Sequence, residues 1–461
     1  MQRPYIFRDP VHGDIGFARD GLHELIRKVV DEELFQRLRG IKQNGVLNLV
    51  FHGAEHSRFT HSLGAAHVAG LMYDAACRNS GLTVDKEQRK HTVLAALLHD
   101  AGHGPFSHLL EEILGKKRFH HETLTARILI EPGSPIGAHL RAHDRDLPEK
   151  LLPFVDDKKW KPRRWYHSIV SSQLDADRLD YTARDAMMAG VVSHRFDRDR
   201  LIGSLYVWRE PQGPGDPADR APREHLAVDD RAHDVVENYL LALYHLYRSI
   251  YLHHTVRAAS WLLNAALRRA RQLCKTDSGL LAQIFPELGG RRDPLWALME
   301  EGHEVSLEEY ARLDEAHVWG LVQRWRSAED ATLRDLCDRL KQRRFLKAID
   351  IAATATIGEA LEMKQKATER FQRERPEFDA ASYVHIDEIS RENYKPYRWG
   401  KRRGDDSGAD PIWLVSKNGV GRPLEDEAKT MIELLDTRFA IRRLIVPDEI
   451  RTALTRDASD A

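Results

Sequence analysis

Helical spacing of apolar residues runs through most of this sequence, from about residue 21 to residue 360. In the segment 59–79, Val68, Leu71, Met72 and Ala75 recur at i, i+3, i+4 and i+7, which is the pattern of one face of an α-helix. Further helices are predicted at 91–100, 106–114, 168–188, 229–275 and 331–370. The chain is therefore expected to be mainly α-helical.

The two ends of the chain depart from this helical pattern. Residues 1–18, punctuated by Pro10 and Gly13, predict a short strand and turn. Beyond about residue 380, short strands are predicted at 383–386, 412–415 and 444–446, with a helix at 424–436. We therefore expect a helical core over residues 1–375 and a small α+β module over 376–461. The segments 209–224 and 401–410, rich in Pro, Gly and charge, are predicted loops.

Composition bears on whether the protein binds nucleic acid, on its redox compartment and on membrane segments. The 70 Lys and Arg residues balance 71 Asp and Glu residues, which gives no support to a dedicated duplex-DNA binder but does not exclude a local basic pocket or contact with nucleic acid. The three cysteines, Cys77, Cys274 and Cys337, form no C-x-x-C pair, so a reducing cytoplasm is expected. The N-terminus lacks the apolar core of a signal peptide, and no apolar run is long enough to span a membrane.

Histidines and acids gather near the ends of predicted helices. His99 and Asp100 follow an apolar helix and precede a break at Gly102, Gly104 and Pro105. Burying an imidazole and a carboxylate costs free energy unless the two groups pair with each other or bind a metal. The residues alone are compatible with either arrangement. Isolated histidines elsewhere, such as His52 and His67, are expected to be solvated or satisfied in the core.

A second predicted helix, at 168–188, carries an unusual polar face. Asp177, Tyr181 and Asp185 recur every four residues on one side, while apolar residues line the opposite side. A solvated surface does not explain this pattern. Asp180 and Arg184, also four residues apart, are interpreted as an ordinary helix ion pair. His61 shares a helix face with Val68 and is expected to point inward.

The order of these motifs resembles the HD-domain metal phosphohydrolases. His61, His99-Asp100 and Asp177 match the H…HD…D signature of that superfamily. The resemblance is closest to the dNTP triphosphohydrolase branch, over roughly residues 5–260, and it rests on motifs that occur in the same order: FRDPVHGDI, IKQNG, HSRFTHSLG, LLHDAGHGPFSH, HHE, LDADRLDYTARD and YRSIYLHH.

This resemblance implies a metal centre and a set of catalytic groups. The implied metal ligands are His61, His99, Asp100 and Asp177, a mixed N/O set suited to Mn, Fe, Ni, Zn or Mg. The implied catalytic residues are His108 and His121, with His103 close to the phosphates. Glu111 stands at a position where the vertebrate enzyme of this branch has an orienting Asp. A neutral-pH imidazole suits protonation of a leaving 5′-oxygen.

The resemblance also implies the substrate contacts. Arg58 and Arg178 match phosphate-binding positions, although the vertebrate enzyme has Lys at the second. The positions that match sugar or base contacts are Gln43, Tyr181, Asp185 and Tyr251. Asn44 stands where the vertebrate enzyme has a Leu that crowds the sugar. His253-His254 stands where that enzyme has His-Lys, so the Lys of an outer phosphate contact is replaced by His254 here.

The implied reaction is hydrolysis of a deoxynucleoside triphosphate to nucleoside and triphosphate by metal-activated water. Homo-oligomers and nucleotide effectors are further expectations from the resemblance. One alternative is an HD-type phosphodiesterase or nuclease that acts on DNA, RNA or cyclic nucleotides. An alternative from a different class is a regulatory module that senses nucleotides without turnover.

Overall fold

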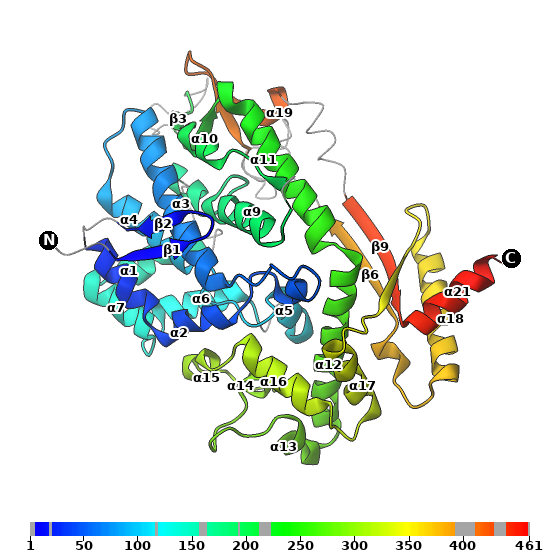
Figure 1. The fold of residues 1–461 in the computed structure, drawn as a ribbon. Helices are drawn as coiled ribbons and strands as arrows, with labels where there is room; N and C mark the ends of the chain where they lie inside the picture. Colours follow the sequence, from blue (N-terminus) through cyan, green and yellow to red (C-terminus); the bar gives the residue numbers. More distant parts are fainter. Residues whose placement is uncertain are drawn as a thin grey trace.

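Helices dominate the structure, as the sequence predicts (Figure 1). The computed structural model describes residues 5–17, 21–115, 119–155, 164–191, 194–211, 223–391, 411–427 and 439–459. The first half contains α1 (Leu22–Val30), α2 (Glu33–Gln36), α3 (Arg58–Asn79), α4 (Lys86–Leu98), α5 (His108–Leu114), α6 (His121–Ile130), α7 (Pro135–His143), α8 (Leu147–Val155), α9 (Ala176–Met188) and α10 (Arg198–Gly203).

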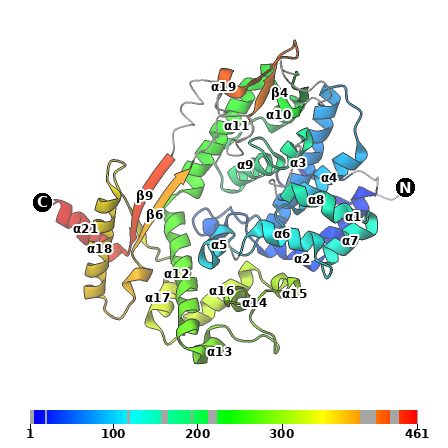
Figure 2. The ribbon, with the colours of Figure 1, turned by 180° about the vertical axis from the view of Figure 1, so that it is seen from behind.

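A long helix, α12 (His254–Thr276), lies between the helices of the first half and the C-terminal segments 357–391 and 439–459 (Figures 1 and 2). It is preceded by α11 (His233–Leu246) and a π turn at Tyr247–Tyr251. The later helices are α13 (Leu281–Ile284), α14 (Pro294–Met299), α15 (Leu307–Ala311), α16 (Glu315–Trp325), α17 (Ala331–Lys341), α18 (Ile357–Glu374), α19 (Leu424–Glu427) and α21 (Asp448–Ser459). Among the described helices, none is both long enough and apolar enough to cross a membrane.

Three small sheets complete the fold. The strands β1 (Ile6–Asp9) and β2 (Gly13–Gly16) form an antiparallel N-terminal hairpin, where the sequence predicts a short strand and turn. A second sheet has the order β3-β4-β7-β8, made of β3 (Leu205–Arg209), β4 (Glu224–Asp229), β7 (Trp413–Val415) and β8 (Gly421–Pro423). The third sheet has the order β5-β9-β6 and is antiparallel, with β5 (Lys347–Asp350), β9 (Phe439–Val446) and β6 (His385–Arg391).

The strands β3, β4 and β5 lie in the region that periodicity predicts as helical, and the structure corrects that prediction. They are short, and each pairs with a strand distant in sequence or across a loop, so local periodicity does not reveal them. Strands are found near 383–386, 412–415 and 444–446, as expected. The predicted helix at 424–436 begins as α19, and residues 428–438 lie outside the described part. So do residues 212–222 of the first predicted loop and all of the second, 401–410.

The strand pairings bear on the domain boundary near residue 375, which stays a prediction. After that point, β7 pairs in parallel with β4 of the first half, while β6 and β9 pair with β5, which precedes the boundary. The helix α18, also before the boundary, contacts α21, β6 and β9. Within the described residues, the C-terminal strands are therefore tied to both halves of the chain.

Two hydrophobic clusters hold the helices together and place the site between them. One cluster joins α1, α3, α4 and α9 with the sheet that contains β3 and β4. The other joins α5, α12, α16 and α17 with β9 and α21. The helices that carry His61, Asp177 and the His99-Asp100 pair belong to the first cluster, whereas α5 and α12 belong to the second.

Candidate active site with a metal-binding cluster

Three helix ends and faces converge to form a cluster of imidazoles and carboxylates. The first turn of α3 carries His61, the C-terminal end of α4 carries His99, and the first turn of α9 carries Asp177. The Nε2 atom of His61 lies 3.0 Å from Oδ1 of Asp177 and 3.4 Å from Nε2 of His99. One ligand atom from each of these three residues lies within 4.8 Å of the others, which is close enough to share one metal ion.

The electrostatics of this cluster favour a cation. Burial lowers the pKa of His61, but hydrogen bonds to Asp177 and Asp180 outweigh it and raise that pKa to about 10. Burial likewise opposes ionisation of Asp177, yet His61 and His99 hold its pKa below the usual value. Two carboxylates thus stabilise a positive charge at a buried position, so the donor set fits a divalent metal with mixed N/O ligands.

Asp100 lies beside the cluster but is also bound to an arginine. Its Oδ1 is 3.3 Å from Nε2 of His99, and its Oδ2 is 3.7 Å from Nε2 of His61. The guanidinium of Arg58 donates to Oδ2 of Asp100 and, opposing the effect of burial, holds the pKa of this carboxyl well below its usual value. The structure therefore brings Asp100 to the predicted site, with one oxygen already committed to Arg58.

Asp180 and Arg184 form the helix ion pair that their spacing predicts, and the structure shows that this pair is buried. Both side chains are fully buried, and Nε of Arg184 donates to Oδ2 of Asp180 at 2.9 Å. The same Oδ2 lies 2.8 Å from Nδ1 of His61. Helical spacing alone predicts the pair but gives no indication that α9 packs against α3, which makes Asp180 a partner of the metal-binding cluster.

The loop between α4 and α5 is held in an unusual backbone conformation. Phe106 and Ser107 have φ angles of 55° and 49°, a region that residues other than glycine rarely occupy. Arg58 donates to Oγ of Ser107 from Nε at 3.1 Å and from a terminal nitrogen at 2.7 Å. Strained backbone persists where surrounding contacts determine it, and here it immediately precedes His108.

The predicted acid–base residues lie along this loop and the helices that follow. Oε1 of Glu111 lies 2.6 Å from Nδ1 of His121, and the rings of His103 and His121 stack with centroids 3.9 Å apart. Burial and the charge of Arg58 hold the pKa of His103 well below its usual value, which keeps this imidazole neutral. His108 is the first residue of α5, and its side chain lies outside the described part of the structure.

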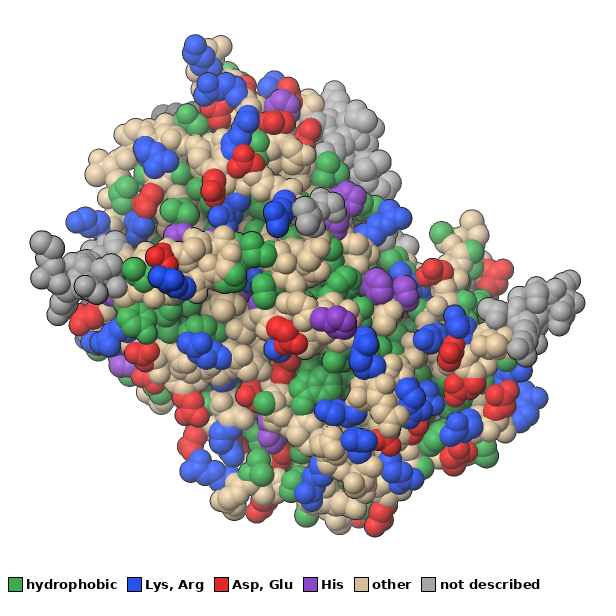
Figure 3. Space-filling model, in the orientation of Figure 1, with side chains coloured by type: hydrophobic (Ala, Val, Ile, Leu, Met, Phe, Trp, Pro, Cys, Tyr) green, Lys and Arg blue, Asp and Glu red, His purple; other side chains and the backbone are tan. Residues whose placement is uncertain are grey.

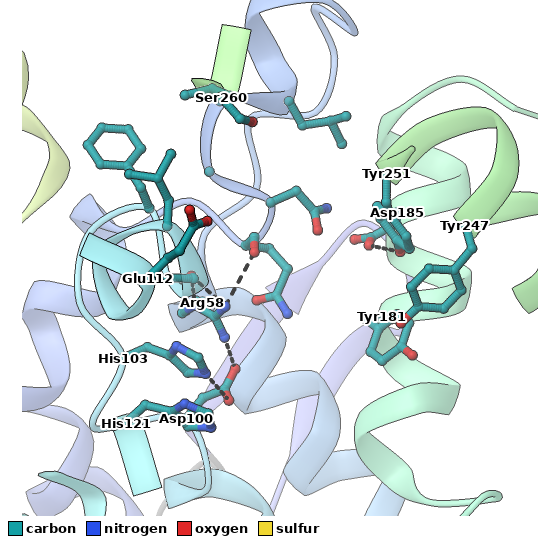
Figure 4. A pocket seen from close by; sticks show the side chains of 18 of the residues that line it. Arg58, Asp100, His103, Glu112, His121, Tyr181, Asp185, Tyr247, Tyr251 and Ser260 are labelled. Carbon is teal, nitrogen blue, oxygen red and sulfur yellow. Dashed lines mark hydrogen bonds and ion pairs between the residues drawn. The ribbon is translucent and has the colours of Figure 1, made fainter. Parts of the chain in front are cut away.

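A cavity of about 710 Å³ extends from this cluster toward α12 (Figure 4). Arg58, Asp100, His103 and His121 lie on one side of it, and Tyr181, Asp185, Tyr247 and Tyr251 lie on the other (Figure 4). Of the predicted site residues, the cavity is lined by Gln43, Asn44, Arg58, His99, Asp100, His103, His121, Asp177, Arg178, Tyr181, Asp185 and Tyr251. The cavity is thus lined by the predicted phosphate and sugar positions and by three of the four predicted metal ligands, whereas His61 and Glu111 do not line it.

The wall opposite His121 contains a short polar network. The hydroxyl of Tyr251 donates to Oδ2 of Asp185, and Nε2 of His56 lies 2.6 Å from Oδ1 of the same carboxylate. Tyr251 ends the π turn that joins α11 to α12, a local distortion that is frequent at functional sites. His56 was not among the predicted site residues, although the quoted HSRFTHSLG motif begins with it.

Glu315 is a further residue that sequence reasoning missed. It lies at the start of α16 and is 4% exposed, and its Oε1 accepts from the backbone N–H of Lys42 at 3.0 Å and of Phe106 at 3.4 Å. Burial raises its pKa to about 8. Because Lys42 precedes Gln43 and Phe106 precedes Ser107, this carboxyl group ties together two segments that line the cavity. No local motif around residue 315 signals this role.

At the far end of the cavity, the C-terminal sheet contributes to the wall. His385 on β6 stacks on Trp261 of α12 with centroids 3.6 Å apart, and Arg257 donates to the buried carboxylate of Asp387 at 2.6 Å. All four of these residues line the cavity. On the face shown in Figure 3, positive and negative side chains are interspersed, in agreement with the balanced composition.

The residues of the metal-binding cluster lie within a region that matches a known protein family. Residues 58–185 match the HD domain. The chain is 31% identical to the uncharacterized protein YwfO of Bacillus subtilis over 447 residues, which cover 96% of this chain and 92% of that protein. It is 32% identical to the deoxynucleoside triphosphate triphosphohydrolase SAMHD1 of Danio rerio over 227 residues, 43% of this chain, and spans only 35% of that relative's length.

A solved structure has the same fold over nearly the whole chain. The crystal structure of a phosphohydrolase from Bacteroides thetaiotaomicron superposes with a TM-score of 0.75 at 25% identity, covering 96% of this chain and 100% of the other. The arrangement of helices and small sheets described above is therefore shared by a protein described as a phosphohydrolase.

Proposed function

Because this chain belongs to the HD-domain family of phosphohydrolases, we propose that it hydrolyses a deoxynucleoside triphosphate to the nucleoside and triphosphate. The observation that carries this proposal is the single cavity that joins the metal-binding cluster to two arginines and a polar, tyrosine-rich wall. Its size of about 710 Å³ lies within the range of small-molecule sites, so a mononucleotide is a suitable occupant.

His61, His99, Asp100 and Asp177 would hold a divalent metal ion at one end of this cavity. When bound, such an ion lowers the pKa of water and polarises a phosphoryl oxygen. His121 would donate a proton to the leaving 5′-oxygen, oriented by Glu111 through its Nδ1 atom. His108 is proposed as a second acid–base group, and neutral His103 would contact the phosphates as a hydrogen-bond partner.

Arg178 and Arg58 would bind the phosphates in different ways. The Arg178 side chain lines the cavity, is 35% exposed and lies 3.7 Å from Asp175, so its guanidinium remains accessible to an anion. Arg58 is held by Asp100 and Ser107, so it would act as a fixed positive charge beneath the phosphates. Tyr181, Asp185 and Tyr251 would contact the sugar or base.

The position of the cleaved bond tests this proposal. The full-length protein loaded with Mn²⁺ is expected to convert at least one dNTP directly to nucleoside and tripolyphosphate, because attack falls at the α-phosphorus. Chromatography resolves the nucleoside, and ³¹P NMR identifies the tripolyphosphate. Stepwise formation of dNDP and dNMP would contradict the proposal. Hydrolysis of cyclic nucleotides, DNA or RNA alone would instead support a phosphodiesterase or nuclease.

Selectivity for the sugar is expected to depend on Asn44. The turn at this point is made by Gly45, with a φ of 54°, while Asn44 lines the cavity, and its buried Nδ2 has no hydrogen-bond partner among the described residues. Its amide can therefore receive a ribose 2′-hydroxyl, so wild type is expected to accept NTPs. An apolar replacement would leave that hydroxyl unpaired, at a cost of about 1–3 kcal/mol.

Asn44→Leu is thus expected to raise the ratio of kcat/KM for dNTP over NTP by roughly 5- to 150-fold, the equivalent of that free energy. Asn48→Leu is the matched control, because Asn48 lies in the same turn, binds Glu55 at 2.8 Å and does not line the cavity. If wild type already excludes NTPs and Asn44→Leu changes nothing, Asn44 acts only in the turn.

A further inference from the structure

A row of buried polar side chains connects His61 to the N-terminal hairpin. The turn between β1 and β2 brings Nε2 of His12 to 2.5 Å from Oδ1 of Asp180. The other oxygen of this carboxylate lies 2.8 Å from Nδ1 of His61. The side chains of all three residues are completely inaccessible to solvent. A segment far from α9 in sequence is therefore in hydrogen-bonded contact with the metal-binding cluster.

The direction of each hydrogen bond in this row follows from the groups present. Arg198 has only donors, and a terminal nitrogen of its guanidinium lies 2.8 Å from Nδ1 of His12, so Nδ1 accepts and the hydrogen of His12 resides on Nε2. Nε2 then donates to Asp180. An ionised carboxylate only accepts, so the hydrogen of His61 shared with Asp180 is on Nδ1.

This arrangement determines which nitrogen His61 offers to a metal. With Nδ1 carrying a hydrogen toward Asp180, the nitrogen that remains is Nε2, which lies 3.0 Å from Oδ1 of Asp177 and 3.4 Å from Nε2 of His99. His99 is oriented in the same sense, since its Nδ1 lies 2.8 Å from the backbone oxygen of Ala96. Both imidazoles therefore direct Nε2 into the cluster.

The surrounding structure keeps the Asp180 carboxylate in place. Arg184 donates to each of its oxygens at 2.9 Å and to Asp9 of β1 at 2.7 Å. Gly64, one helical turn after His61, leaves the space this pair needs, because a Cβ atom there would lie 2.0 Å from Oδ1 of Asp180. Arg184, His12 and His61 thus all contact this buried carboxylate.

We propose that the N-terminal hairpin positions the metal centre, with Arg198, His12 and Asp180 forming a relay that fixes the tautomer and orientation of His61. This inference rests on the proposed function, because it assumes a metal at His61. Outer-shell partners of a ligating histidine typically change metal affinity by about 10- to 100-fold. His12 and Arg198 are thus positioning residues that act through Asp180.

Metal affinity measures this role without reference to any substrate. Mn²⁺ is titrated calorimetrically into EDTA-treated full-length protein. His12→Phe removes both ring nitrogens and is expected to weaken Mn²⁺ binding by about 10- to 100-fold. His12→Gln restores a donor toward Asp180 and is expected to bind more tightly than His12→Phe. His67→Phe is the matched control, because the His67 ring packs edge-on against His12 at 5.3 Å but is not part of the relay.

Wild-type Mn²⁺ affinity in a His12→Phe protein with an unchanged melting temperature would overturn the inference. Arg198→Gln provides a second test in case His12→Phe fails to fold, since Arg198 is 18% exposed. This variant is expected to weaken Mn²⁺ binding several-fold, and unchanged affinity would count against the relay. Loss of affinity in these variants, with no dNTP hydrolysis by wild type, would overturn the substrate proposal alone. A wild-type protein that binds no Mn²⁺ would overturn both.

Discussion

Replacing Asp177 with Asn is expected to abolish metal binding and hydrolysis together. Its carboxylate lies 3.0 Å from Nε2 of His61 and 3.6 Å from Nε2 of His99, and it supplies negative charge at the centre of the cluster. The amide retains the shape but removes the charge. Because loss of an outer-shell partner already costs about 10- to 100-fold in metal affinity, loss of this ligand is expected to cost more than about 100-fold.

Metal content and kcat, measured on the same samples, test this expectation. Asp234→Asn provides the control, since it removes one carboxylate from a position that is 54% exposed on α11. Metal at 100 times its Kd should also raise the free energy of unfolding of wild type by about 2.7 kcal/mol. The same metal concentration should leave the melting temperature of Asp177→Asn unchanged. An Asp177→Asn protein that retains Mn²⁺ with wild-type affinity would show that the metal is held elsewhere.

The second large effect is expected for His121→Ala, which should retain the metal but lose about 10²- to 10⁴-fold in kcat. His121 lines the cavity, is hydrogen-bonded through Nδ1 to Glu111 and is outside the cluster of His61, His99 and Asp177. Its removal would therefore delete a proton donor and leave the metal ligands in place.

His120→Ala is the matched control for His121→Ala. The His120 ring stacks on His121 with centroids 4.8 Å apart, yet it lies 3.5 Å from Glu122 and is not among the residues that line the cavity. We expect near wild-type kcat for His120→Ala. Full activity in His121→Ala would refute its role as the acid and shift that role to His108.

Much of the fold and site could be predicted because the signals are local. Apolar residues with helical spacing predicted the helical fold, and Pro10 and Gly13 predicted a short strand and turn where the N-terminal hairpin is found. The spacing of Asp177, Tyr181 and Asp185 predicted a common face of α9, and all three line the cavity. The ordered motifs identified the family, since they encode chemistry in short runs of sequence.

The sequence by itself therefore determined which residues are polar on otherwise apolar helices. Only the tertiary structure decided which of these polar side chains contact one another. The sequence predicted Asp180 only as the partner of Arg184 in a helix ion pair, whereas the packing of α9 against α3 also places its carboxylate against His61. His12 contacts Asp180 although it lies 168 residues before it in the sequence. Glu315 contacts Phe106 although it lies 209 residues after it. Such contacts depend on how helices and strands pack over long sequence distances, and periodicity carries no information about that packing.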